Sequence, residues 1–207
     1  IFASLQDSKG YMWFATRSGL NRYDGYKFNL YFNDPKDSTS LSDDGTNSLY
    51  EDKNGNLWIG TIYGNINRFD AKTESFTYKN ISELVEIRPD QTDDFYEYPL
   101  SFSRNQKTTI TSITEDKDGK LWIGTWGNGV IVVDKSFKKY NHFYYDINNP
   151  NTLRTNRIMD LNFDSDGRLW IATFGGGLTR LTKSIKDSKE IFSFETLLQG
   201  ENEFSLS

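Results

Sequence analysis

Apolar and polar residues alternate in short stretches along the chain, which is the pattern of half-buried β-strands. Residues 46–52 and 110–116 are two such stretches, and each ends on an Asp that begins a turn-forming sequence. A second stretch follows each turn, as in residues 57–61, where both faces are apolar. Strands that are apolar on both faces are covered on both sides. The pattern therefore predicts short strands in sheets that lie between neighbouring sheets.

A ten-residue motif, D-x-x-G-x-x-W-x-x-T, occurs four times, at residues 7–16, 52–61, 116–125 and 164–173. Its Trp residues follow one another at intervals of 45, 64 and 48 residues. A unit of about 45 residues holds four short strands with their turns, which is one blade of a β-propeller. The sequence therefore predicts an all-β fold of four-stranded antiparallel blades. We expect blades at about residues 1–32, 46–80, 108–145 and 155–196, with an insertion at about 82–107 in the longest interval.

The repeated residues have a local structural explanation. Asp can accept a hydrogen bond from the backbone two residues on, Gly supplies a positive φ, and a hairpin follows. We therefore interpret the repeat positions as structural: Asp7, Gly10, Trp13, Asp52, Gly55, Trp58, Asp116, Gly119, Trp122, Asp164, Gly167 and Trp170. The stretch 116–119 also resembles the start of a calcium loop, but no Glu closes it at the expected distance. No metal site is predicted.

Composition narrows the possible functions. Aromatic residues make up 15% of the chain, and they favour pleated, half-buried surfaces. The net charge of -5, without a basic cluster, argues against a nucleic-acid partner. The absence of Cys excludes disulfides and thiolate chemistry, and the single His, His142, leaves little material for metal sites or His-based catalysis. No cofactor is expected.

Apolar runs are short, with residues 130–133 as an example, whereas a membrane helix needs about 20 apolar residues. We therefore expect no membrane contact by this segment, and no signal peptide is visible. The sequence begins at Ile1, inside a predicted strand, which suggests an excised or processed piece.

The repeat resembles a known family. The core D-x-x-G-x-L-W-I-G-T, followed by Gly-Leu-x-Arg-Tyr/Phe-Asp, is similar to the two-component regulator propeller repeat. The links at residues 33–42 and 146–153 are similar to the Asp-Pro-Asn-rich connections of that family, and residues 201–207 resemble the start of another. The resemblance covers essentially the whole chain.

The resemblance implies the periplasmic sensor of a hybrid histidine kinase of the Bacteroidetes type. In that family two seven-bladed propellers precede an immunoglobulin-like domain, a membrane helix and the kinase. The chain would then be part of a seven-bladed propeller in the extracytoplasmic part of an inner-membrane protein. It would recognise an oligosaccharide and regulate polysaccharide-utilisation genes. The implied partners are the remaining blades and a second copy of the parent receptor. The four blades alone leave two apolar blade faces open.

Antiparallel order places the loops between the second and third strands of each blade at one end, with the connections between blades and the insertion. These loops vary among the repeats, so we expect ligand binding there. The candidates are Trp126, Asn128, Tyr63, Asn65, Arg17 and Phe174, with Phe95, Tyr96 and Tyr98 from the insertion. Trp126 stands out because it lies outside the repeat, and sugar rings stack on indole. The alternative explanation is that Trp126 and the insertion serve packing or an interface.

Two other functions compete with glycan sensing. One is a protein–protein or dimerisation scaffold without a small-molecule site, and a flat, apolar outer edge would favour it. A glycosidase or lyase would need two carboxylates about 5 to 9.5 Å apart. The most regular acids of this chain lie at four equivalent turns, which argues for structure. We therefore expect this segment not to be an enzyme.

Overall fold

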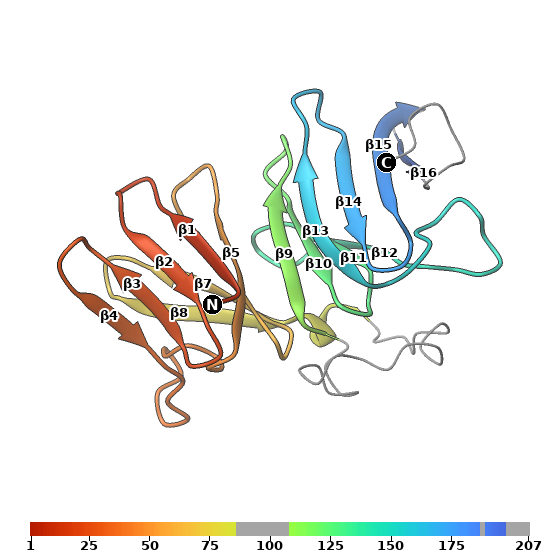
Figure 1. Cartoon of the computed structure of the whole chain (residues 1–207). Coiled ribbons are helices and arrows are strands. Elements are labelled where there is room, and N and C mark those ends of the chain that lie inside the picture. The colour runs from red at the N-terminus through yellow and green to blue at the C-terminus, as the bar shows by residue number, and fades with distance from the viewer. Residues whose placement is uncertain (86–107, 187–188, 198–207) are drawn as a thin grey trace. The chain divides into compact units, whose positions relative to one another are not determined.

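The computed structural model describes residues 1–85, 108–186 and 189–197, and Figure 1 shows their strands in four sheets. Each sheet holds four strands in sequence order. The first two sheets are β1 (Ala3–Gln6), β2 (Met12–Ala15), β3 (Leu20–Tyr23), β4 (Phe28–Tyr31), and β5 (Thr46–Glu51), β6 (Leu57–Thr61), β7 (Asn65–Asp70), β8 (Ser75–Asn80). The other two are β9 (Ile110–Glu115), β10 (Leu121–Thr125), β11 (Val130–Val133), β12 (Tyr140–Phe143), and β13 (Ile158–Phe163), β14 (Leu169–Thr173), β15 (Leu178–Lys186), β16 (Lys189–Leu197).

Neighbouring strands pair antiparallel, and the one helix of the described residues is a single 3-10 turn, Ile81–Glu83. The predicted class, an all-β fold of four-stranded antiparallel blades, is confirmed. A total of seven blades stays a prediction. Most of the predicted insertion, residues 86–107, lies outside the described residues.

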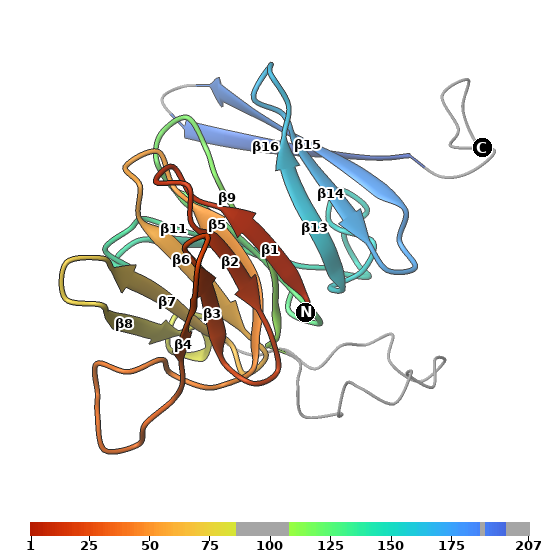
Figure 2. The same cartoon turned by 60° about the vertical axis from the view of Figure 1, so that its left-hand side comes forward.

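The chain divides into two compact units. Among the described residues the first unit contains 1–85 and 108–113, and the second contains 114–186 and 189–197. Figure 2 shows the first two sheets of the first unit from another side. Each unit has its own buried apolar core.

In the first unit, Trp13 of β2 packs edge-on against Phe69 of β7, with ring centroids 5.0 Å apart. Tyr31 and Phe76 complete this aromatic group. In the second unit, Trp122 of β10 meets Phe163 of β13 in the same way, at 5.6 Å. The motif Trp of the first blade in each unit therefore faces the blade that follows, which is how neighbouring sheets cover one another.

The spacing that the four copies of the motif share follows from one hydrogen-bonded hairpin. Asp7 accepts the backbone N–H groups of Lys9 and Tyr11 at 3.0 and 2.9 Å on one carboxylate oxygen. Its other oxygen accepts the indole N–H of Trp13 at 2.8 Å. Gly10 adopts a φ of 88°, a left-handed conformation that favours Gly, and its N–H bonds back to the Asp7 carbonyl. The motif is thus one closed set of bonds between turn and strand.

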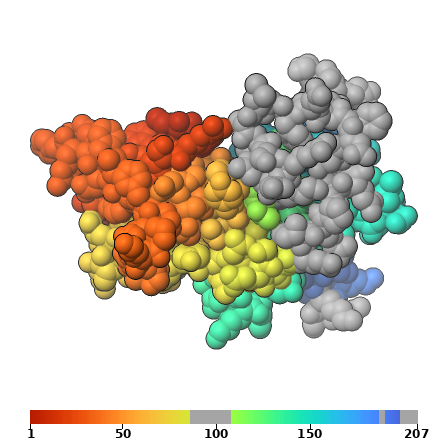
Figure 3. All heavy atoms as spheres, turned by 90° about the horizontal axis from the view of Figure 1, so that it is seen from below, coloured from red at the N-terminus to blue at the C-terminus, as the bar shows by residue number. Residues whose placement is uncertain are grey.

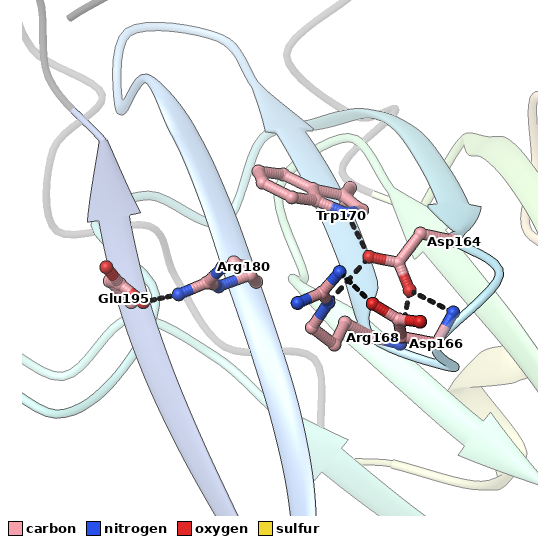
Figure 4. A network of polar contacts seen from close by, with 6 residues as sticks. All are labelled: Asp164, Asp166, Arg168, Trp170, Arg180 and Glu195. Carbon is pink, nitrogen blue, oxygen red and sulfur yellow. Dashed lines mark hydrogen bonds and ion pairs between the residues drawn. The ribbon is translucent and has the colours of Figure 1, made fainter. Parts of the chain in front are cut away.

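The same bonds recur in the other three blades, and Figure 4 shows them around Asp164 and Trp170. There Arg168 adds a side-chain bond to Asp164 at 2.7 Å. Partial burial acts to raise the pKa of Asp164, but the hydrogen bonds from Trp170 and Arg168 outweigh it and hold the pKa well below its ordinary value. On the neighbouring strands Arg180 pairs with Glu195 and lies over the Trp170 ring, 5.7 Å from its centroid.

Candidate functional site

The last residue of the motif closes the loop between the second and third strands in the same way in the first, third and fourth blades, whereas in the second blade the Thr61 hydroxyl accepts the Asn65 N–H at 3.0 Å. The Thr16, Thr125 and Thr173 hydroxyls donate to the Gly19, Gly129 and Gly177 carbonyls at 2.9, 2.8 and 2.7 Å. Each bond closes a short loop and fixes the residues between. The repeat therefore builds a constant frame, and the sequence between its Thr and Gly supplies the variable side chains.

In the second unit, two aromatic side chains from equivalent loops lie together. The Trp126 and Phe174 ring centroids are 5.4 Å apart with planes tilted by 51°. Trp126 is half-buried and Phe174 is 40% exposed. The backbone of Arg157 positions both residues. It forms an isolated antiparallel β-bridge with Trp126, and its carbonyl accepts the Phe174 N–H at 2.9 Å. The pair thus has a fixed backbone and a partly solvent-facing aromatic surface.

The loop beneath these rings is tightly bonded. Asn156 accepts the N–H groups of Gly127 and Gly129 on its carbonyl, both at 2.9 Å. Asn128 is only 1% exposed, its N–H donates to Thr125 at 3.0 Å, and its carbonyl lies 2.7 Å from His142 Nε2. Asn128 therefore lies in the interior of the loop rather than on the exposed surface with the rings.

In the first unit, the predicted candidates lie at the corresponding end of the blades. Figure 3 looks onto this end, where the orange connection after β4 lies beside the yellow segment after β8. Tyr63 is 57% exposed, and the half-buried Asn65 accepts from Asn80 at 2.9 Å and donates to Asp43 at 3.3 Å. Arg17 is exposed and lies over the Phe2 ring, 5.8 Å from its centroid.

Asp43 is a residue that the sequence reasoning did not single out. Burial raises the pKa of its carboxyl above the ordinary value, although hydrogen bonds from Thr61, Asn65 and the Gly45 N–H oppose the shift. Asp43 lies in the connection between blades, outside the ten-residue motif, so the repeat carried no signal for it. The available signal was an acidic residue two positions before Gly45, the residue that precedes β5.

The structure thus brings Trp126 and Phe174 together in the second unit, and Tyr63 and Asn65 lie in neighbouring positions of the first. The three insertion candidates, Phe95, Tyr96 and Tyr98, lie outside the described residues. Across residues 1–85, 108–186 and 189–197 there is no group of three or more His, Asp or Glu side chains that could hold a metal ion. Nor does any helix in this part of the chain have the length and apolarity to cross a membrane.

Comparison with known proteins agrees with this architecture. The family model of the two component regulator propeller matches residues 40–63, 106–127 and 152–175, which contain the second, third and fourth motifs. A stretch of 37 residues is 54% identical to Histidine kinase P4 from Formosa agariphila, covering 18% of this chain and 3% of that protein.

Two similar solved structures are extracellular domains from B. thetaiotaomicron, BT4673 and BT3049, each described as belonging to a "putative hybrid two component system". Another structure of the BT4673 domain carries the description "putative one component system". BT4673 shares 25% identity with a TM-score of 0.61, over 87% of this chain and 23% of that one. BT3049 shares 21% identity with a TM-score of 0.57, over 99% of this chain and 35% of that one. The latter likeness supports the fold.

Fold and motif together define a run of β-propeller blades. Three segments of the chain match the two component regulator propeller, and the chain is similar to the extracellular domain of BT4673. It spans only 3% of the curated relative and 23% and 35% of the two solved domains.

Proposed function

We propose that this chain forms part of the ligand-sensing propeller of a hybrid two component system and recognises an oligosaccharide. The segment itself performs no catalysis. Ligand binding controls the histidine kinase of the parent protein and, through it, genes for polysaccharide utilisation. The sensor lies in the periplasm, in keeping with the extracellular domains to which the chain is similar.

The observation that carries this proposal is the contact of Trp126 with Phe174. Sugar rings present C–H faces that pack on aromatic rings, and the two rings, 5.4 Å apart and tilted by 51°, offer two such faces at an angle. Their loops are fixed by bonds to Asn156 and Arg157, so little freedom is lost on binding. A rigid, partly solvent-exposed aromatic surface is suited to an amphipathic ligand such as a glycan.

The test is calorimetric titration of the full chain with a panel of neutral oligosaccharides, followed by the variants Trp126→Ala and Phe174→Ala. We expect a bound oligosaccharide whose affinity falls by about tenfold or more in each variant, which is about 1.4 kcal/mol of binding energy. Tyr140→Ala is the matched control, because Tyr140 is an aromatic residue of the same unit that is 53% exposed and lies on β12. Unchanged affinity in both folded variants, or an equal loss in the control, contradicts the proposal.

A second candidate function is a scaffold for protein contacts. One face of β4 carries apolar side chains at alternate positions, with Phe28 56% and Leu30 55% exposed, and Tyr26 and Phe32 continue the row on either side. Exposed apolar rows of this kind mark surfaces that another protein or blade covers. The occupants we propose are a remaining blade of the parent propeller or a second receptor copy. A glycan panel without any binder, together with self-association through this face, favours the scaffold.

A further inference from the structure

A pocket of about 380 Å³ lies at the opposite end of the first unit, where the Asp-x-x-Gly turns are. It is bounded by the turn between β1 and β2, the turn between β5 and β6, and the turn between β7 and β8. Its apolar lining comes from Tyr11, Trp13, Leu57 and Phe69, which belong to or flank the core between the first two blades. The volume lies in the range of small-molecule sites and is sufficient for a ligand of one or two sugar rings.

The carboxylates that line this pocket are already bonded within the chain. Asp7 accepts two backbone N–H groups and the Trp13 indole, as described above. Glu51 accepts both the backbone N–H and the hydroxyl of Ser8, at 2.7 and 2.6 Å. Asp70 accepts the Lys72 N–H at 2.8 Å, and this bond lowers the pKa of its carboxyl. These acids are occupied by donors of the turns.

The cations of the pocket are not matched in the same way. Within the described residues, no carboxylate lies within 4.0 Å of the side-chain nitrogens of Lys9, Arg68 or Lys72, although all three line the pocket. Arg22 also lines it; its terminal nitrogen pairs with Glu74 at 2.8 Å, while its Nε is buried without a hydrogen-bond partner. The cations that line the pocket outnumber its carboxylates by one, and Asp70 acts on Arg68 and Lys72 through charge without an ion pair within 4.0 Å.

In the second unit a carboxylate of the protein itself occupies the corresponding place. The third residue of the Asp-x-x-Gly turn is Lys9 in the first blade and Asp118 in the third. Asp118 pairs with Lys183 of β15 at 2.8 Å, and Lys183 also pairs with Glu190 of β16 at 2.8 Å. There the cation from the following blade meets two carboxylates, whereas in the first unit the lysines of both blades line one pocket. Like charges so placed repel, and a bound anion relieves the repulsion.

We propose that this pocket binds the carboxylate or sulfate group of a small acidic ligand, such as a uronic acid or a sugar sulfate. Lys9, Arg68 and Lys72 supply the charge. The site is separate from the Trp126 and Phe174 surface and belongs to the first unit alone. The proposal goes beyond neutral glycan recognition and does not depend on it.

The experiment titrates the full ¹⁵N-labelled chain with glucuronic acid, glucose 6-sulfate, inorganic sulfate and glucose, and follows the amide shifts of residues 8–11 and 70–73 and the indole shift of Trp13. We expect saturable shifts with the acidic compounds, weakening as salt is raised, and none with glucose. The carboxylate and sulfate arms distinguish the two anionic groups, and inorganic sulfate shows whether the sugar ring contributes. Equal shifts with glucose, or no shifts with any acid, overturn the proposal.

Two variants make the assignment specific. Lys9→Gln combined with Lys72→Gln should weaken binding by about tenfold or more, while Lys36→Gln, an exposed lysine in the connection after β4, should leave it within about twofold. Lys9→Asp copies the turn residue of the third blade and should abolish binding while the chain remains folded. Affinity that survives both changes assigns the anion to another place, and a folded Trp126→Ala variant that loses it does the same.

Discussion

Trp58 donates its indole N–H to the carboxylate of Asp52 over 3.0 Å, and the two side chains are only 2% and 4% exposed. The other oxygen of Asp52 accepts the N–H groups of Asn54 and Asn56, both at 2.9 Å. A buried carboxylate that accepts hydrogen bonds from three residues of its own hairpin is a strong local constraint. It is also easily tested, because removing one oxygen leaves buried donors without acceptors.

Asp52→Asn should therefore destabilise the chain by about 2 kcal/mol, since an amide NH₂ would face either the indole or the two backbone donors. Urea unfolding followed by tryptophan fluorescence measures the change. Asp166→Asn is the control, because Asp166 is an acid of an equivalent turn whose side chain is 64% exposed, and its loss should cost less than about 0.5 kcal/mol. Equal costs for the two variants would contradict a special role for the buried carboxylate.

The Gly that follows the motif Trp by two positions should be intolerant of Ala in the second blade. A Cβ on Gly60 would lie 2.3 Å from Ser48 Oγ and 2.4 Å from Ile110 Cγ2. We expect Gly60→Ala to cost about 1–3 kcal/mol through overpacking. The same position holds Ala172 in the fourth blade, so Ala172→Gly is the matched reverse change and should cost only about 0.5–1 kcal/mol. Thermal unfolding measures the stability of both variants. A Gly60→Ala variant as stable as wild type would show that the blades separate easily there.

Tyr31→Phe should be neutral or stabilising at pH 7. Within the described residues the Tyr31 hydroxyl is buried without a hydrogen-bond partner, so its removal loses no bond. Burial raises the pKa of Tyr31 to about 12, above the unfolded value of 10.0. The folded state therefore holds its proton more tightly, and wild-type stability falls as the pH rises from 10 towards 12.

The phenylalanine variant lacks this titration, so its advantage over wild type should grow across that pH window. Denaturant midpoints at pH 7 and at alkaline pH measure the effect. A constant difference between the two proteins would remove the raised pKa as its cause.

Asp43 should make stability depend on pH in the acidic range, as Tyr31 does in the alkaline range. Its pKa is raised by burial, so the folded protein binds a proton more readily than the unfolded chain. Stability contributed by this group is present at low pH and is lost as the pH rises from 3.8 through the folded pKa. Asp43→Asn should therefore flatten the fall in stability over that window relative to Asp44→Asn, a neighbouring acid of the same connection. Parallel pH profiles for the two variants would exclude Asp43 as the titrating group.

The apolar row on β4 predicts self-association of the chain by itself. Phe28→Ser with Leu30→Ser removes two of its members, which are 56% and 55% exposed, and should lower the weight-average mass towards the 24.0 kDa of one chain. Sedimentation equilibrium at increasing concentration measures the mass. Tyr140→Ser, which changes an exposed aromatic residue on β12, should leave the association unchanged.

The fold was predictable because its determinants are local and repeated. Asp, Gly and Trp at fixed spacing specify a turn and a strand together, and four copies in one chain leave little room for another architecture. The length of the nine-residue strands β15 and β16 was harder to predict from the sequence, because the residues of β15 beyond Leu181 are mostly polar. Ion pairs of Lys183 with Asp118 and Glu190 stabilise this extension. Such pairs join distant positions and leave no trace in a local pattern.

The candidate site was predictable in part. Trp126 stood out because it lies outside the repeat, but its contact with Phe174 depends on how successive blades pack. The burial of Asn128 was not foreseen, since a polar residue between two glycines indicates an exposed loop. The pocket at the turn end was missed because the turns were interpreted through the Asp and Gly that repeat in every blade. Lys9, which lines the pocket, occupies a variable position between them.

Each Asp–Trp bond begins and ends within one hairpin, so no blade depends on another for it. A blade gained or lost by duplication or deletion of its coding segment brings or removes the complete set, and no partner is stranded elsewhere. Proteins assembled from such units can therefore change the number of blades and the loops between them during evolution while each blade keeps its own Asp–Trp hydrogen bond.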